Sequence, residues 1–325
     1  MTPETRGFWL GVLGTAIFAA TLPMTRLAVG AADAPRLSPE FTTLGRAAVA
    51  GLLSALTLLL VLRGPWPRRH HWTPLLIGVA GNAVGYPLLL AWGLRTVSSG
   101  HAAVITALLP LTTAAVAAVV LHQRARLGFW VCAAGGSVLV VAFSLLRASG
   151  PGGGFGVEPA DLLLALGMLA ASVGYVYGAR VTPELGAERT ICWVTVLALP
   201  LTLPGAWWTW PAQPAAVPAA AWAGFAYLAL FSMWIGFFAW YRGLALGGAL
   251  RVSQAQLLQP FFSILFAVPL LGESLDPVTL GFAAATVAMV GLGRMLSRPR
   301  PHGALPAPSA TVPARRAAAG RATPR

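Results

Sequence analysis

The chain has little charge, and most of that charge is of one sign. Only 10% of its 325 residues are charged while 57% are apolar, and nine acidic residues stand against 22 basic ones. A typical soluble protein carries about 25% charged residues. None of the basic residues is lysine, which is typical of a GC-rich coding bias and carries no functional argument. The composition excludes an ordinary soluble domain and indicates a membrane protein.

Residue patterns typical of catalytic and cofactor sites are also missing. Cys132 and Cys192 each fall inside an apolar segment, which argues against a disulfide framework. The five histidines have no metal-binding spacing, and no acidic pair lies within an apolar segment. We therefore expect no cofactor and no metal site, and a membrane-embedded enzyme is a remote alternative.

Long apolar runs fill almost the whole chain. A helix needs about 20 residues, at about 1.5 Å per residue, to cross the ~30 Å hydrocarbon core of a bilayer. Ten segments reach about that length: 8–29, 41–62, 74–94, 101–121, 127–146, 161–179, 190–208, 219–241, 252–271 and 277–296. The sequence therefore predicts an all-α integral membrane protein with ten transmembrane helices.

The arginines predict how these helices are oriented. If the N-terminus is cytoplasmic, seventeen arginines fall on the inner side, and only Arg36, Arg95 and Arg147 fall in outer loops. Basic residues favour cytoplasmic loops, so we expect both termini in the cytoplasm and the protein in the inner (plasma) membrane. The net charge of +13 does not indicate nucleic acid, because the arginines are spread over short loops instead of forming one patch.

The predicted organisation has five parts. Residues 1–7 form a cytoplasmic N-terminus, 8–146 a first set of five helices, 147–160 an external linker, 161–296 a second set of five, and 297–325 a tail. The tail is rich in proline, alanine and glycine and has no acidic residue, so it is expected to be disordered. Its arginines could contact anionic membrane lipids. The sequence is also compatible with a homodimer.

An internal repeat relates the two sets of helices. A shift of 150 residues aligns residues 92–124 with 242–274 without a gap, and identical residues and polar interruptions coincide. The pairs include Gly93 and Gly243, Leu108 and Leu258, Pro110 and Pro260, Thr106 and Gln256, and Thr113 and Ser263, and the same shift pairs Asn82 with Ser232 before these segments. A five-helix set that starts inside must be followed by one that starts outside, so the copies are inverted. Inverted repeats are characteristic of secondary transporters, whose substrate site lies near the bilayer midplane.

Residues 8–296 resemble the EamA-type members of the drug/metabolite transporter superfamily. The resemblance rests on Arg46, on the segments "GLRTVSSGHAAVITALLP" and "GLALGGALRVSQAQLLQP", and on Gly272–Glu273 within "LLGESLDPVTLGFAAATVAMVGL". The first half has His122–Gln123 where the family closes its fourth helix with Gly-Glu. The resemblance implies a ten-helix carrier made of two five-helix repeats, which exports small polar or amphipathic metabolites such as amino acids, or drugs.

Polar residues recur on one face of several predicted helices. Positions three or four apart share a helix face, so these residues are expected to converge on one cavity that binds a small-molecule substrate: Thr21, Thr25, Asn82, Tyr86, Thr106, Thr113, Ser172, Tyr175, Ser232, Trp240, Gln256, Gln259 and Ser263. Pro110 and Pro260 should bend their helices around it, since a proline removes a backbone hydrogen bond. For each Ser or Thr, a hydrogen bond between helices without contact to substrate is the alternative.

Three charged residues near helix ends are further candidates: Arg26, Arg46 and Glu273. The arginines could attract the carboxylate of an anionic or zwitterionic substrate, or could instead reach the interface or pair with Glu40 or Glu273. No acidic residue falls in the middle of a predicted span, which disfavours proton coupling through such a group. A channel or a lipid flippase on the same scaffold is the alternative to a transporter.

Overall fold

The computed structural model describes residues 2–120, 127–148, 158–247, 255 and 258–297. Within this part of the chain the protein is all-helical. Seven helical segments are long and apolar enough to cross a membrane: Thr5–Val29, Pro39–Leu60, Arg69–Gly93, Ser99–Val120, Pro159–Leu185, Ala187–Trp208 and Ala219–Trp240. All seven coincide with predicted spans, and the all-α membrane fold is confirmed to that extent.

Several of these segments consist of consecutive helices. In chain order the helices are α1 (Pro3–Ala19), α2 (Thr21–Val29), α3 (Pro39–Leu60), α4 (Arg69–Gly78), the π-helix η1 (Val79–Gly85), α5 (Tyr86–Gly93), α6 (Ser99–Thr106), α7 (Leu109–Val120), α8 (Leu127–Ala148), α9 (Pro159–Leu185), α10 (Ala187–Trp208), the 3₁₀ helix η2 (Pro214–Ala216), α11 (Ala219–Tyr227), the π-helix η3 (Leu228–Ile235), α12 (Gly236–Gly247), α14 (Gln259–Leu271) and α15 (Pro277–Ser297). Helices α8, α14 and α15 overlap the remaining predicted spans.

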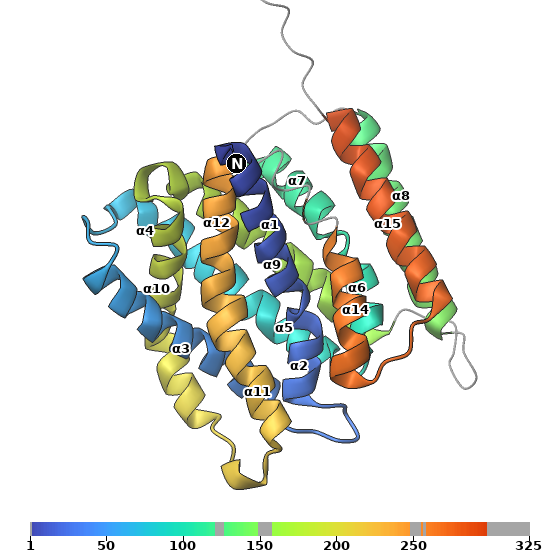
Figure 1. The fold of residues 1–325 in the computed structure, drawn as a ribbon, viewed down its shortest axis with the longest axis horizontal. Helices are drawn as coiled ribbons and strands as arrows, with labels where there is room; N and C mark the ends of the chain where they lie inside the picture. The colour runs from blue at the N-terminus through green and yellow to red at the C-terminus, as the bar shows by residue number, and fades with distance from the viewer. Residues whose placement is uncertain (1, 121–126, 149–157, 248–254, 256–257, 298–325) are drawn as a thin grey trace, which may run out of the picture.

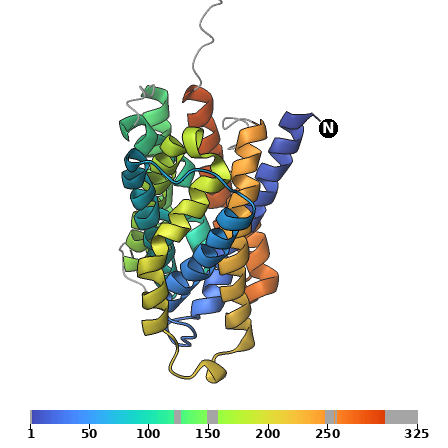
Figure 2. The same cartoon turned by 90° about the vertical axis from the view of Figure 1, so that its left-hand side faces the viewer.

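Helices from the two halves of the chain lie side by side. Helix α1 packs along α12, and α3 packs along α10. Helices α8 and α15 form a pair at one side of the bundle (Figure 1). The N-terminal end of α1 and the C-terminal end of α15 lie at the same end of the molecule (Figures 1 and 2). The bundle is therefore held together by contacts between the halves.

Local sequence explains where several helices begin and end. The hydroxyls of Ser38 and Ser98 accept hydrogen bonds from the backbone N–H groups at the starts of α3 and α6, over 3.0 and 3.1 Å, as N-cap residues do. Gly272 ends α14 with a φ of +69°, a conformation that glycine adopts at little cost. This turn brings the next residue, Glu273, toward α6.

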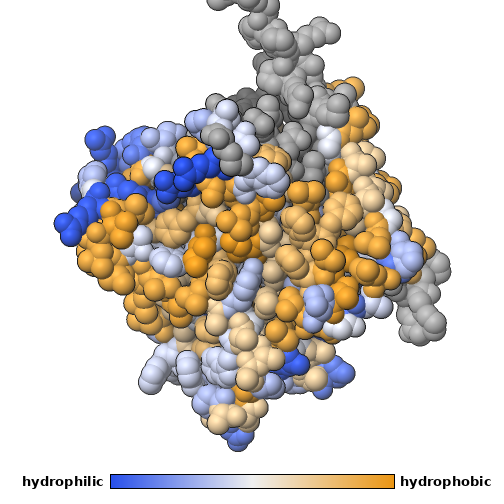
Figure 3. Space-filling model, viewed as in Figure 1, coloured by the Kyte–Doolittle hydropathy of each residue, from blue (hydrophilic) through white to orange (hydrophobic). Residues whose placement is uncertain are grey.

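The surface is apolar around the middle of the bundle. Figure 3 shows an apolar band across one face of the bundle, with hydrophilic residues toward its two ends. Large apolar side chains are exposed, for example Leu59 at 70% and Trp208 at 89%. Indole rings favour the interface between hydrocarbon and headgroups. This surface is suited to lipid and not to water.

Helix interruptions occur at equivalent positions in the two halves. The π-helix η1 covers residues 79–85 and η3 covers 228–235, which the 150-residue shift nearly superimposes. Helix α7 begins at Leu109 and α14 at Gln259, which the same shift superimposes. Pro110 and Pro260 are each the second residue of these helices. A proline is tolerated in the first turn of a helix, where its missing N–H would have no partner. Pro110 therefore starts α7 after a short break that follows α6, instead of bending a continuous helix. For Pro260, residues 256 and 257 before α14 lie outside the described part of the chain.

Candidate functional site

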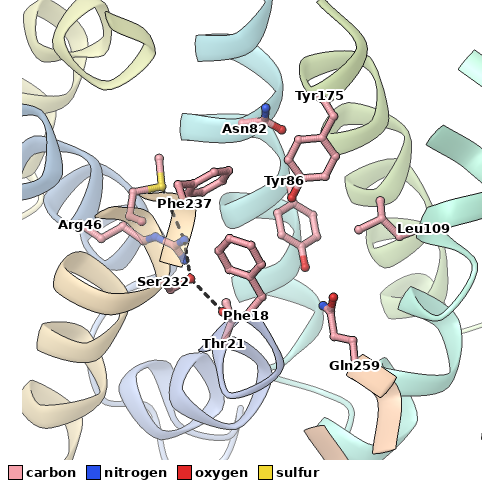
Figure 4. Close-up of a pocket in the computed structure, with 11 residues that line it drawn as sticks. Phe18, Thr21, Arg46, Asn82, Tyr86, Leu109, Tyr175, Ser232, Phe237 and Gln259 are labelled. Carbon is pink, nitrogen blue, oxygen red and sulfur yellow. Dashed lines mark hydrogen bonds between the residues drawn. The ribbon is translucent and has the colours of Figure 1, made fainter. Parts of the chain in front are cut away.

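A cavity lies between the two halves, at the interrupted helices. The space between its lining side chains amounts to about 510 Å³, a volume that includes narrow gaps between atoms and the opening to solvent. Side chains of both halves line it: Phe18, Thr21, Arg46, Asn82, Tyr86, Leu109, Tyr175, Ser232, Met233, Phe237 and Gln259. Figure 4 shows these side chains pointing toward a common space from different helices. Asn82 and Ser232 occupy equivalent places in the repeat, and so do Leu109 and Gln259.

Arg46 supplies the charge of this cavity. Its side chain is only 4% exposed, and it lies about 10 Å along α3 from Pro39, at ~1.5 Å per residue. The guanidinium Nη2 lies 3.4 Å from the Ser232 Oγ and 3.7 Å from the Met233 Sδ, whereas its Nε has no hydrogen-bond partner among the described residues. No carboxylate oxygen of these residues lies within 4.0 Å of it. A buried charge without a counter-ion is costly, so this position calls for a functional reason.

Hydrogen bonds hold the polar wall in place. The hydroxyls of Thr21 and Ser232 lie 2.8 Å apart, which joins the start of α2 to η3 and to Arg46 (Figure 4). Asn82 is 8% exposed, and its Oδ1 has no donor among the described residues. A Cβ atom built on Gly174 would lie 2.7 Å from that Oδ1. Helix α9 therefore needs a glycine where η1 presents Asn82.

Aromatic rings form the rest of the wall. The rings of Phe18 and Phe237 meet edge to face, with centroids 5.0 Å apart. Tyr86 and Tyr175 extend toward the same space from α5 and α9 (Figure 4). None of the described lining residues is a histidine or an acidic residue. The cavity thus combines one cation, several neutral hydrogen-bonding groups and an aromatic surface, which suits an amphipathic molecule that bears an anionic group.

The predicted substrate-binding residues divide into three groups. Thr21, Asn82, Tyr86, Tyr175, Ser232 and Gln259 line the cavity, as does the charge candidate Arg46. Gln256 lies outside the described residues. The others lie elsewhere in the bundle: Thr25, Thr106, Thr113, Ser172, Trp240 and Ser263.

Most members of the last group hold helices together or bond within one helix. Ser172 lies 3.1 Å from the Thr113 hydroxyl across α9 and α7, and Ser263 donates to the Ala19 carbonyl over 2.8 Å. Thr25 and Thr106 each donate to a carbonyl four residues earlier in the chain. Trp240 packs against Phe18, with ring centroids 6.3 Å apart. These side chains fit the alternative of structural hydrogen bonds and packing.

The other two charge candidates have protein partners outside the cavity. Arg26 donates through Nη1 to the Leu94 carbonyl. Glu273 accepts hydrogen bonds from the backbone N–H groups of Ser99 and Gly100, over 2.9 and 3.2 Å, at the start of α6. The alternative in which Arg46 pairs with Glu40 or Glu273 is wrong, because both carboxylates have other partners and Arg46 is buried in the cavity.

Sequence reasoning missed Phe18, Leu109, Met233 and Phe237 as lining residues. Each is an apolar residue in an apolar span, where the sequence does not distinguish a cavity wall from a lipid-facing surface. Leu109 had one usable signal, since the repeat places it opposite Gln259.

A histidine and glutamate group lies at the junction of α4 and α9. The Nε2 atoms of His70 and His71 lie 3.1 and 3.0 Å from the same oxygen of Glu184, and the three ligand atoms are close enough for a metal ion. The backbone N–H of Arg68, however, donates to His71 Nδ1 over 3.1 Å. A neutral His71 then carries its proton on Nε2 and donates it to Glu184. His71 is thus oriented to donate a hydrogen bond to Glu184 and not to bind a metal through Nε2.

The match to known proteins covers both halves of the chain. The model of the EamA-like transporter family matches residues 5–146 and residues 158–293. The chain belongs to the EamA-like transporter family. The resemblance seen in the sequence is confirmed, and the protein is a membrane transporter of the drug/metabolite transporter superfamily.

Two relatives align over nearly their whole length. The chain is 38% identical over 298 residues to "Uncharacterized transporter YdeK" of Bacillus subtilis (strain 168), covering 92% of this chain and 100% of that protein. It is 28% identical over 302 residues to "Probable terminal-alkyne amino-acid exporter" of Streptantibioticus cattleyicolor, and the alignment covers 89% of this chain and 93% of that protein. A solved structure described as "Crystal structure of protein" superimposes with a TM-score of 0.56 over 91% of this chain and 98% of that chain, and at 20% identity this likeness shows the fold alone.

Proposed function

We propose that this EamA-like transporter exports small amphipathic metabolites that carry a carboxylate, such as amino acids or related compounds, and that the cavity around Arg46 is its substrate site. The observation that carries the proposal is the buried guanidinium of Arg46, which has no carboxylate partner among the described residues. An arginine buried within a membrane protein marks a substrate or ion site by default. The substrate carboxylate would supply the missing counter-ion.

The remaining wall fits the rest of such a molecule. The amides of Asn82 and Gln259 and the hydroxyls of Thr21 and Ser232 offer donors and acceptors for a polar group. The aromatic rings offer a face to an ammonium group through cation–π attraction, and an apolar surface to a side chain. The printed name of the Streptantibioticus relative, an amino-acid exporter, supports a substrate of this class.

We infer an alternating-access mechanism from the repeat. Ten spans, arranged as two inverted sets over residues 8–146 and 161–296, would place the cavity near the bilayer midplane, between halves that rock against each other. The interruptions at equivalent positions support this arrangement, and so does the place of the N-terminal end of α1 and the C-terminal end of α15 at one end of the bundle. Both termini would lie in the cytoplasm, with the protein in the inner membrane, as the arginines predict. The substrate crosses without a covalent step.

Counterflow in proteoliposomes tests the proposal. Vesicles that contain the purified protein are loaded with an unlabelled amphipathic amino acid and diluted into a trace of the labelled compound. We expect saturable uptake of label that is accelerated by the internal substrate, because a carrier exchanges one bound molecule for another. Flux that rises linearly with concentration, without acceleration, would instead indicate a channel. Movement of labelled phospholipid alone would indicate a flippase.

A further inference from the structure

A second pocket lies at the end of the bundle where α1 begins and α15 ends, between the C-terminal end of α3 and the start of α10. It encloses about 520 Å³ of empty space, counted together with its opening. Leu58, Leu59, Leu62, Arg63, Gly64, Trp66, Arg189 and Trp193 line it. Figure 3 shows hydrophilic residues gathered over the connection between α3 and α4, directly beside the apolar band. The pocket thus lies where the hydrocarbon and the headgroups of a bilayer would meet.

Two guanidinium groups face this pocket without carboxylate partners. Arg63 donates through Nε to the Leu59 carbonyl over 3.2 Å, and Arg189 donates through Nη2 to the Pro65 carbonyl. Among the described residues, neither lies within 4.0 Å of a carboxylate oxygen, although Glu188 precedes Arg189 in the chain. Arg189 is also the third residue of α10, where the helix dipole favours an anion. The pocket is electrostatically suited to an anion.

Two buried N–H donors at the pocket lack acceptors. The Nε of Arg189 and the indole Nε1 of Trp193 are both inaccessible to solvent and without a hydrogen-bond partner among the described residues. Trp193 is only 7% exposed. A buried donor without an acceptor costs free energy comparable to a lost hydrogen bond. A phosphate group held by the guanidinium groups has spare acceptor oxygens, which would serve these two donors once the side chains that cover them move.

The apolar part of the pocket distinguishes a lipid from a free phosphate ion. Leu59 is 70% exposed and Trp66 is 74% exposed, and both lie next to the arginines. The Trp66 ring lies against the Trp193 ring, with centroids 5.0 Å apart. An inorganic anion would leave this leucine and indole surface uncovered, whereas an acyl chain beneath a phosphate headgroup would cover it.

We propose that this pocket binds an anionic phospholipid, with the phosphate on Arg63 and Arg189 and an acyl chain along the leucines at the end of α3. Basic pockets between helices on the cytoplasmic side of membrane proteins bind anionic headgroups, and each arginine near the surface contributes about 1 kcal/mol. The site is separate from the substrate cavity, with which it shares no lining residue.

Thermal unfolding of the purified full-length protein, with added phosphatidylglycerol or phosphatidylcholine, tests the proposal. A ligand that binds only the folded form raises the melting temperature. We expect phosphatidylglycerol to raise it more than phosphatidylcholine does. In the double variant Arg63→Gln/Arg189→Gln the dissociation constant for phosphatidylglycerol should rise about 25-fold, because each arginine contributes about fivefold. The two lipids should then raise the melting temperature of this variant equally.

Matched variants separate the site from general charge effects. Arg242→Gln removes an exposed arginine that does not line the pocket and should keep the preference for phosphatidylglycerol. Arg63→Lys/Arg189→Lys keeps both charges and should retain most of it. If the double glutamine variant does not fold, Arg63→Gln alone should weaken binding about fivefold, because the side chain is exposed.

Two results would overturn the proposal. One is an undiminished preference for phosphatidylglycerol in the Arg63→Gln and Arg63→Gln/Arg189→Gln variants. The other is that inorganic phosphate without lipid raises the melting temperature of the wild-type protein as much as phosphatidylglycerol does, which would assign the pocket to a soluble anion.

Discussion

Replacing Arg46 should strongly weaken substrate binding without weakening the fold. We consider Arg46→Met, which keeps a long unbranched side chain and removes the charge. In the structure Arg46 makes one long hydrogen bond, 3.4 Å to Ser232, and one 3.7 Å contact to the Met233 sulfur. It therefore contributes little to packing that methionine could not replace.

The expected magnitudes follow from burial. A hydrogen bond between charged groups contributes about 1.5–3 kcal/mol, so loss of the substrate carboxylate's partner should weaken apparent substrate affinity by about 10- to 150-fold. Replacing a buried ion pair by apolar residues of similar volume is often neutral or stabilising, by about 1–4 kcal/mol. Removing a buried charge that has no counter-ion also removes its desolvation penalty. The melting temperature of Arg46→Met without substrate should therefore equal or exceed that of the wild type.

Counterflow and thermal unfolding, measured on the same preparations, test both expectations. Arg46→Lys serves as the control that keeps the charge and loses the planar, bidentate geometry, and it should retain part of the transport. Wild-type counterflow in Arg46→Met would refute the assigned role of this residue. A large fall in the melting temperature of Arg46→Met would show instead that the guanidinium is structural.

Three further predictions concern the same cavity. Asn82→Leu keeps the side-chain volume but removes the amide. It should raise the half-saturation concentration of the substrate in counterflow about fivefold, which corresponds to the loss of one hydrogen bond. The amount of protein inserted in the membrane should stay unchanged. Gly174→Ala should also slow transport, because the added Cβ would lie 2.7 Å from the Asn82 amide. The control Gly281→Ala, where nothing lies within 4 Å of the added Cβ, should leave transport unchanged. Equal transport rates for the two variants would argue against a role for Asn82. Since no histidine or acidic residue is among the described residues that line the cavity, an imposed pH gradient across vesicles should change the transport rate little. A steep dependence would show that a titratable group other than these lining residues takes part.

The sequence was most informative where the membrane imposes strict rules. The length of a span is set by the thickness of the hydrocarbon core. The sequence alone therefore predicts the spans that seven long helical segments of the structure match. The 150-residue shift was also informative in detail. It paired Asn82 with Ser232 before the structure placed both in π-helices that line one cavity.

The sequence could not decide which polar residues face the cavity. A helix has room for Ser or Thr on any side, because the hydroxyl can donate to a carbonyl of its own helix, as Thr106 does. Ser263 has the spacing expected of a cavity residue, yet it donates to the end of α1. Which face meets substrate depends on how the helices cross, and helix crossing is a property of tertiary packing.

The sequence left open, for a related reason, whether Arg46 reaches the interface or the cavity. An arginine seven residues after Pro39 would normally be expected to reach the interface along its own helix. Here α3 packs along α10 and against η3, so the guanidinium lies between helices next to Ser232. Contacts between helices that are distant in the sequence determine that position, and the sequence pattern alone does not predict them.

The most direct test compares ligands that differ only in the carboxylate. The melting temperature of the purified wild-type protein is measured with an amphipathic amino acid, with its carboxamide and with the corresponding amine that lacks the carboxyl group. We predict that only the amino acid stabilises the protein strongly, by about 2.7 kcal/mol at 100 times its dissociation constant, and that Arg46→Met loses this stabilisation. Equal stabilisation by the amine, or an undiminished shift in Arg46→Met, would contradict the account.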